Sequence, residues 1–95
     1  MAKTKPANKE LKDLYEAVLK LQTTSECKKF FRDLCTLSEI NAMAERFQIV
    51  KLVDGKTPYR EISKKIGSST ATITRVAHWL HHGKGGYKLV LERLK

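Results

Sequence analysis

A run of short hydroxyl and methyl side chains follows Gly67, and these residue types suit contact with the base edges of a DNA duplex. The outward face of the helix predicted there carries Ser69, Thr70, Ala71 and Thr74. The methyl groups can meet the thymine methyl, and the hydroxyls can bond to bases or phosphates. We expect Thr70, Ala71 and Thr74 to read bases, and Ser69 to cap the helix and contact a phosphate.

Basic side chains surround this run and are suited to bind phosphates. Such contacts fix a protein on the duplex without reading its sequence, and they make affinity fall steeply with salt. The alternative is that they simply solvate helix faces. The basic residues concerned are Lys56, Arg60, Lys64 and Lys65.

The excess positive charge is concentrated in the last two-fifths of the chain. The 95 residues hold 19 Lys and Arg against 10 Asp and Glu, a net charge of +9. Residues 56–95 alone hold nine basic and two acidic residues, a net charge of +7. The hydrophobic content of 41% is enough for a folded core, so the charge does not indicate disorder. A polyanion, double-stranded DNA above all, is therefore the first partner to consider.

The histidines and cysteines could bind metal, but their settings favour structural roles. His78, His81 and His82 fall at i, i+3 and i+4 on a predicted helix end, a spacing that could hold an ion. No carboxylate or cysteine is obviously convergent with them, so we expect no metal, and favour charge complementarity with the helix C-terminus. Cys27 and Cys35 share an apolar stripe and are predicted to be small buried hydrophobes.

Other classes of protein lack support in the sequence. No Gly-rich phosphate loop, Ser-His-Asp set or carboxylate pair is visible, so we expect neither an enzyme nor a cofactor. No run near 18 apolar residues predicts a membrane span, and the basic start lacks the apolar stretch of a secretory signal. With only two cysteines, we expect a cytoplasmic protein with reduced thiols.

Apolar spacing predicts helices throughout, in one all-α domain over residues 1–95 with about six helices. Residues 1–8 look like a flexible basic arm, and a break is expected at Thr23-Thr24-Ser25. Thr36-Leu37-Ser38-Glu39 is a capping box that opens a third helix, which Asp54-Gly55 ends. That third helix is apolar on more than one face, which is typical of a central helix or a dimer element.

Residues 57–80 have the pattern of a helix-turn-helix. Thr57 is expected to cap the first helix, with Pro58 at its first position. Small Ser63 permits a close crossing, and Gly67 suits the sharp turn. The inward residues are predicted to be Ile62, Ile66, Ile73, Val76, Ala77 and Leu80.

Several segments match the pattern of a known family. The most specific is Ala71-Thr72-Ile73-Thr74-Arg75 in the second helix of the pair. With Glu45-Arg46-Phe47-Gln48-Ile49-Val50, Arg60-Glu61-Ile62 and Gly67, it resembles the Trp repressor superfamily, and nearly the whole chain resembles its TrpR-like branch of the YerC/YecD type. The resemblance implies an intertwined homodimer whose two reading heads enter successive major grooves, so the target should be pseudopalindromic.

The resemblance also implies a pocket for a small effector. In the repressor, two arginines sandwich the indole of bound tryptophan and a threonine meets its carboxylate; Arg46, Arg75 and Thr36 stand at the matching positions. Val76 replaces a glycine and Trp79 a small serine, so we expect both to fill the cavity and make tryptophan unnecessary. The alternative for the arginines is ion pairing or contact with DNA phosphates.

Together these observations predict a homodimeric, sequence-specific DNA-binding transcriptional regulator, expected to repress by occupying an operator. One alternative is a general nucleic-acid binder, for DNA or RNA, that uses the same charge without base reading. The other is a helical protein-interaction module, for which salt-dependent DNA binding would be absent.

Overall fold

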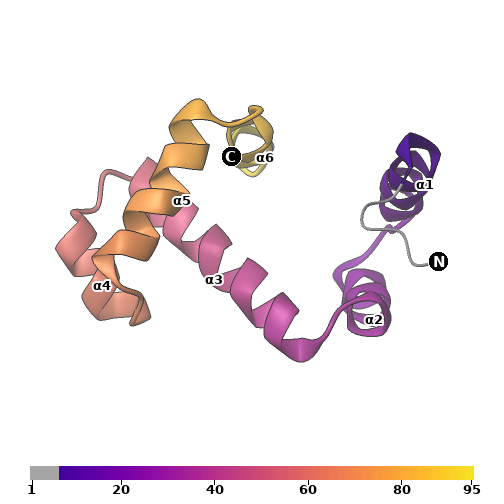
Figure 1. Cartoon of the computed structure of the whole chain (residues 1–95), viewed down its shortest axis with the longest axis horizontal. Helices are drawn as coiled ribbons and strands as arrows, with labels where there is room; N and C mark the ends of the chain where they lie inside the picture. The colour runs from indigo at the N-terminus through magenta and orange to yellow at the C-terminus, as the bar shows by residue number, and fades with distance from the viewer. Residues whose placement is uncertain (1–6) are drawn as a thin grey trace. The chain divides into compact units, whose positions relative to one another are not determined.

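The computed structural model describes residues 7–95, and over these residues the chain is all-α, as predicted (Figure 1). No strand occurs in this range. The expected basic arm falls almost wholly outside the described residues, and the first helix begins where that arm was expected to end. The six helices are α1 (Asn8–Leu19), α2 (Thr24–Leu34), α3 (Leu37–Asp54), α4 (Tyr59–Ile66), α5 (Thr70–His82) and α6 (Gly86–Arg93).

The chain divides into two compact units, residues 1–40 and residues 41–95. The first unit contains α1, α2 and the first turn of α3, and the second contains the rest of α3 with α4, α5 and α6. Among residues 7–95 we find no helix with the length and apolar character that crossing a membrane requires.

Local capping shapes the first unit. Thr23 Oγ1 accepts the N–H of Glu26 at 3.1 Å, and the Glu26 carboxylate accepts the N–H of Gln22 at 2.8 Å. This places the start of α2 at Thr24, inside the expected break, because Thr23 is the residue that caps. No residue of α1 or α2 is buried. Cys27 and Cys35 are free thiols and only half-buried, so the expectation of full burial is not met.

The predicted capping box at the start of α3 is confirmed. Thr36 Oγ1 accepts the N–H of Glu39 at 3.1 Å, and the Glu39 carboxylate accepts the N–H of Thr36 at 2.8 Å. The pKa of Glu39 is lowered, chiefly because the Thr36 backbone N–H donates to its ionised carboxylate and secondly because of hydrogen bonding with the Thr36 side chain.

The end of α3 differs in detail from the expectation. The N–H of Thr57 donates to Leu52 O and that of Lys56 to Val53 O, both at 3.0 Å, which is the Schellman pattern. The left-handed residue is Lys56, with φ of 67°, and Gly55 does not have a positive φ. The glycine therefore closes the helix without supplying the left-handed turn.

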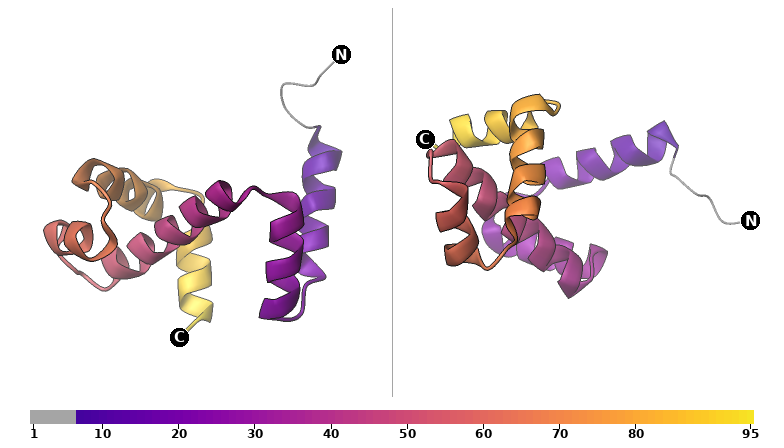
Figure 2. Two further views of the ribbon diagram at one scale, coloured as in Figure 1. Left: turned by 90° about the horizontal axis from the view of Figure 1, so that it is seen from below. Right: turned by 60° about the vertical axis from the view of Figure 1, so that its left-hand side comes forward.

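The hydrophobic core lies entirely in the second unit. It joins the C-terminal half of α3 to α4 and α5, and α4 packs against α5 across the turn (Figure 2). Ile66, Tyr87 and Leu91 pack against its edge. Every inward residue predicted on α5 belongs to it. The buried residues are Ile49, Val50, Val53, Ile62, Ile73, Val76, Ala77 and Leu80.

Candidate nucleic-acid interface and adjoining pocket

The turn between α4 and α5 is fixed by a glycine and by a serine hydroxyl. Gly67 has φ of 86°, and its N–H donates to Ser63 O at 2.8 Å. The Ser63 hydroxyl donates to Ser68 O at 2.7 Å. The sequence indicated only that Ser63 is small; its bond across the turn was not foreseen, because it depends on the three-dimensional closure. The angle between the two helices therefore rests on a hydrogen bond as well as on close packing.

The start of α4 is shifted by one residue from the prediction. Pro58, not Thr57, is the N-cap, and no side chain caps this helix. The Pro58 carbonyl accepts the N–H of Ile62 at 3.1 Å and that of Glu61 at 3.0 Å. Only Thr57 and Pro58 separate the left-handed Lys56 from α4. Thr57 closes the turn after α3, because its N–H donates to Leu52 O.

Ser69 caps α5, as predicted. Its hydroxyl accepts the N–H of Thr72 at 3.1 Å and lies 3.0 Å from Thr72 Oγ1. The cap holds the first turn of α5 in the geometry that displays the neighbouring side chains. Ser68, one residue earlier, is buried, and its hydroxyl has no hydrogen-bond partner among the described residues.

The predicted base-reading side chains lie on the exposed face of α5. Thr70, Ala71 and Thr74 are exposed, whereas Ile73 is fully buried on the opposite side. The Thr74 hydroxyl donates to Thr70 O at 2.9 Å, so its hydrogen is already used within the helix. The face is thus a firm surface of methyl groups and hydroxyl oxygens, which matches the residue types that approach base edges.

The basic side chains around this face are free to contact phosphates. All four are exposed, and within residues 7–95 none forms a salt bridge that would neutralise it. Arg60 and Lys64 line one shallow hollow with Pro58 and Glu61 on α4. Lys65 follows on the same helix, and Lys56 lies in the turn before it.

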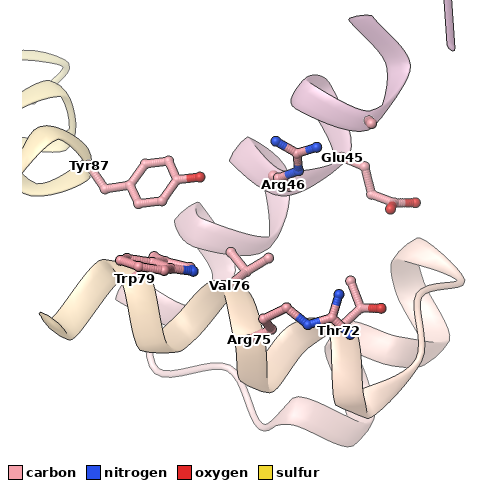
Figure 3. A pocket seen from close by; sticks show the side chains of 8 residues that line it. Glu45, Arg46, Thr72, Arg75, Val76, Trp79 and Tyr87 are labelled. Carbon is pink, nitrogen blue, oxygen red and sulfur yellow. The ribbon is translucent and has the colours of Figure 1, made fainter. Parts of the chain in front are cut away.

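A pocket of about 390 Å³ opens between α3, α5 and α6 in the second unit (Figure 3). Arg46 reaches it from α3 and Arg75 from α5, as the resemblance implied, and neither guanidinium has a hydrogen bond or ion pair within the described residues. Trp79 and Tyr87 lie at one end, and the charged groups lie at the other. Thr36, which was also expected in the pocket, is not among the residues that line it, and its hydroxyl caps α3.

Trp79 does not fill this cavity. Val76 is buried, but Trp79 is 57% exposed and forms part of the pocket wall. In the single chain both side chains line a pocket that stays open, so the expectation that they close the space is not met there.

Four further pocket residues were not foreseen. Thr72 stands one turn before Val76 on α5, and helical spacing could have identified it. Ala42 could have been found in the same way, four residues before Arg46 on α3, and Glu45 then follows three residues after Ala42. Tyr87 could not, because α6 follows two turn glycines and its direction is set only by packing.

Comparison with known proteins agrees with this geometry. Residues 9–95 match the family described as Trp repressor protein. The chain is 39% identical over 87 residues to the uncharacterized protein YerC of Bacillus subtilis (strain 168), covering 92% of this chain and 84% of that protein.

Two solved structures are also similar. A TrpR-like protein from Eubacterium eligens has a TM-score of 0.87 at 39% identity, over 92% of this chain and 90% of its own. A Staphylococcus aureus protein described as a candidate Trp repressor has a TM-score of 0.87 at 38% identity, over 93% and 88% of the two chains.

Proposed function

Because this chain belongs to the Trp repressor family, we propose that it is a DNA-binding transcriptional regulator that recognises a specific operator as a homodimer. We infer that α4 and α5 form its reading head and that it represses by occupying the operator. In this proposal the protein is not an enzyme and acts in the cytoplasm, where the DNA is.

The exposed N-terminal face of α5 is the observation that carries the proposal. A helix that contacts base edges in the major groove must present short side chains to the DNA, and its opposite face must be anchored in the protein core. Thr70, Ala71 and Thr74 meet the first condition, and the fully buried Ile73 meets the second. The unpaired Arg60 and Lys64 on α4 supply the charge that fixes the register on phosphates.

Uncovered apolar side chains support the homodimer. In the single chain, Leu37 and Met43 on α3 are exposed, and so are Leu89 and Val90 on α6 and Leu94 at its C-terminal cap. A second copy that covered them would bury the surface that one chain of this size cannot bury alone. Two reading heads related by a two-fold axis then meet half-sites about 34 Å apart, one turn of DNA, on a pseudopalindrome.

The decisive experiment is selection of bound fragments from random duplex DNA. We expect an enriched pseudopalindromic motif with half-sites about 10 base pairs apart. The selected duplex should then outcompete bulk DNA by at least about a thousandfold at fixed salt. Enrichment of no motif, with binding that only follows salt, would make the protein a general nucleic-acid binder. No salt-dependent DNA binding at all would favour a protein-interaction module.

Two substitutions in the reading head separate base reading from phosphate contact. Lys64→Ala should weaken binding to selected and to random DNA alike. It should also lower the slope of log affinity against log salt concentration by about 1 per reading head. Thr74→Val, which keeps the shape but removes the oxygen, should change the preferred base, with a discrimination of about 1–3 kcal/mol. Lys20→Ala, at the C-terminal cap of α1, is the matched control and should leave both properties unchanged. If Lys64→Ala and Thr74→Val lose affinity for selected and random DNA to the same extent, the assigned roles are contradicted.

We also infer that the reading head holds its shape without bound tryptophan. The core between α3, α4 and α5 is complete, and buried Val76 forms part of it. Calorimetric titration with L-tryptophan should therefore show no micromolar binding, and DNA affinity should not depend on it. Micromolar binding in the pocket of Arg46 and Arg75 would refute this.

A further inference from the structure

Three histidines occupy the last two turns of α5, and the rings of two of them lie close together at a tilt. The rings of His78 and His82 have centroids 4.9 Å apart with 37° between their planes, and both residues are exposed. The rings of His81 and His82 are 6.4 Å apart and nearly perpendicular, at 71°. The pair at i and i+4 therefore differs from the adjacent pair in both distance and orientation.

We propose that His78 and His82 form a binding site for a divalent transition-metal ion of the Ni²⁺, Cu²⁺ and Zn²⁺ class. Imidazole nitrogens bind these ions at about 2.0–2.1 Å in the case of zinc. Two histidines one helical turn apart can direct one nitrogen each to the same ion, as in helices that carry the H-E-x-x-H motif. The 4.9 Å between the ring centroids makes the two rings neighbours, and both side chains are exposed, so rotation about their χ angles can bring one nitrogen of each to a shared ion.

The surroundings suit a cation held by two protein ligands. The last carbonyl groups of α5 carry partial negative charge, and the site lies beside them. No group of three or more metal-binding side chains converges anywhere in residues 7–95, so water completes the coordination shell. The site is therefore an open, exchangeable one and not a buried structural centre.

Trp79 connects the histidine pair to the pocket. Its ring lies 5.4 Å from that of His78, edge to face, and it also lines the pocket of Arg46 and Arg75. An ion on His78 thus lies directly behind a wall of that pocket. Trp79 is also the only tryptophan of the chain, so its fluorescence reports on the site.

The test is metal titration of the full chain without an affinity tag, in a Cys27→Ser, Cys35→Ser background that removes competing thiols. Trp79 fluorescence is followed with NiCl₂, and binding of ZnCl₂ is measured by calorimetry. We expect saturable quenching by Ni²⁺ and one ion bound per chain. His78→Ala and His82→Ala should each lower the metal affinity by at least about tenfold. Loss of a residue that only hydrogen-bonds to a metal ligand already has an effect of that size.

His81→Ala is the matched control and should bind within about twofold of the parent, because the His81 ring lies 6.4 Å from that of His82 and nearly perpendicular to it. Circular dichroism checks that each variant folds, and His78→Gln and His82→Gln replace any alanine variant that does not. Absence of saturable binding in the parent would overturn the proposal. So would a loss of affinity in His81→Ala as large as that in His82→Ala.

Discussion

The two units of the chain differ in how they are stabilised. Of the residues that the structure describes, all eight buried apolar ones lie in residues 41–95, so this unit has a core of its own. In the unit that precedes it, α1 and α2 bury none, and Leu19 is 80% exposed. That unit has side-chain caps at Thr23 and Thr36, and its apolar stripes are at most half-buried. The difference indicates that the second unit has a core of its own, whereas in the proposed homodimer the first unit would be covered by the second copy.

The largest effect should come from the core of the reading head. Ile73→Ala is expected to lower the free energy of unfolding by about 2–5 kcal/mol, because it leaves a cavity beside other fully buried side chains. Ile40→Ala, at a partly buried position of the first unit, is the matched control and should cost less than half as much. Urea unfolding measures both, at a chain concentration where sedimentation shows a monomer. Equal costs there would show that the first unit has a core of its own.

The next effect concerns the partner itself. If a second copy covers the first unit, each tenfold rise in chain concentration should add about 1.4 kcal/mol to the stability of the assembly. Hydrogen exchange should then show the amides of α1 and α2 losing protection on dilution, while those of α4 and α5 keep it. Protection of α1 that does not change with concentration would contradict the proposed dependence.

A smaller effect is expected inside the turn of the reading head. Ser68→Ala should raise the free energy of unfolding by about 1 kcal/mol, because it removes a buried hydroxyl without a partner. Ser68 O, which accepts from Ser63, is retained in this variant. Ser63→Ala removes the donor of that bond and should therefore lower the free energy of unfolding. Thermal unfolding of both variants compares them, and destabilisation by Ser68→Ala would indicate an unrecognised partner for its hydroxyl.

The smallest effect should come from the capping box of α3. The pKa of Glu39 is lowered in the folded chain, so its stabilisation is complete above the ordinary glutamate value of about 4.3. It is lost as the pH falls through the folded pKa. Glu39→Gln keeps a capping side chain that does not titrate, so the stability difference between the two proteins should shrink at low pH. A difference that stays constant with pH would contradict this role.

Most of the fold could be predicted from the sequence because its signals are local. The stripe of Ile73, Val76, Ala77 and Leu80 follows helical spacing, and all four residues are buried. The caps at Ser69 and Thr36 depend on contacts three residues apart, and both were correctly predicted. The turn at Gly67 needs a positive φ, which glycine adopts without strain.

What could not be predicted depends on contacts distant in sequence or on competition between neighbours. The left-handed position at the end of α3 fell on Lys56 although Gly55 was available, because the helix continued through Asp54 before turning. The open pocket beside Trp79 was not expected, since nothing local determines whether an indole fills a cavity or lines it. The placement of Tyr87 in the pocket wall required the path of α6.

The hydrogen bond from Thr74 to Thr70 O limits which hydrogen-bonding groups Thr74 can offer to a base in the proposed complex. While the hydroxyl hydrogen is held by the backbone, the side chain offers outward only a lone pair and a methyl group. A lone pair suits the amino hydrogens of adenine or cytosine, and a methyl group suits thymine, whereas guanine presents two acceptors that need a donor. Operator positions facing this residue should therefore avoid guanine on the contacted strand.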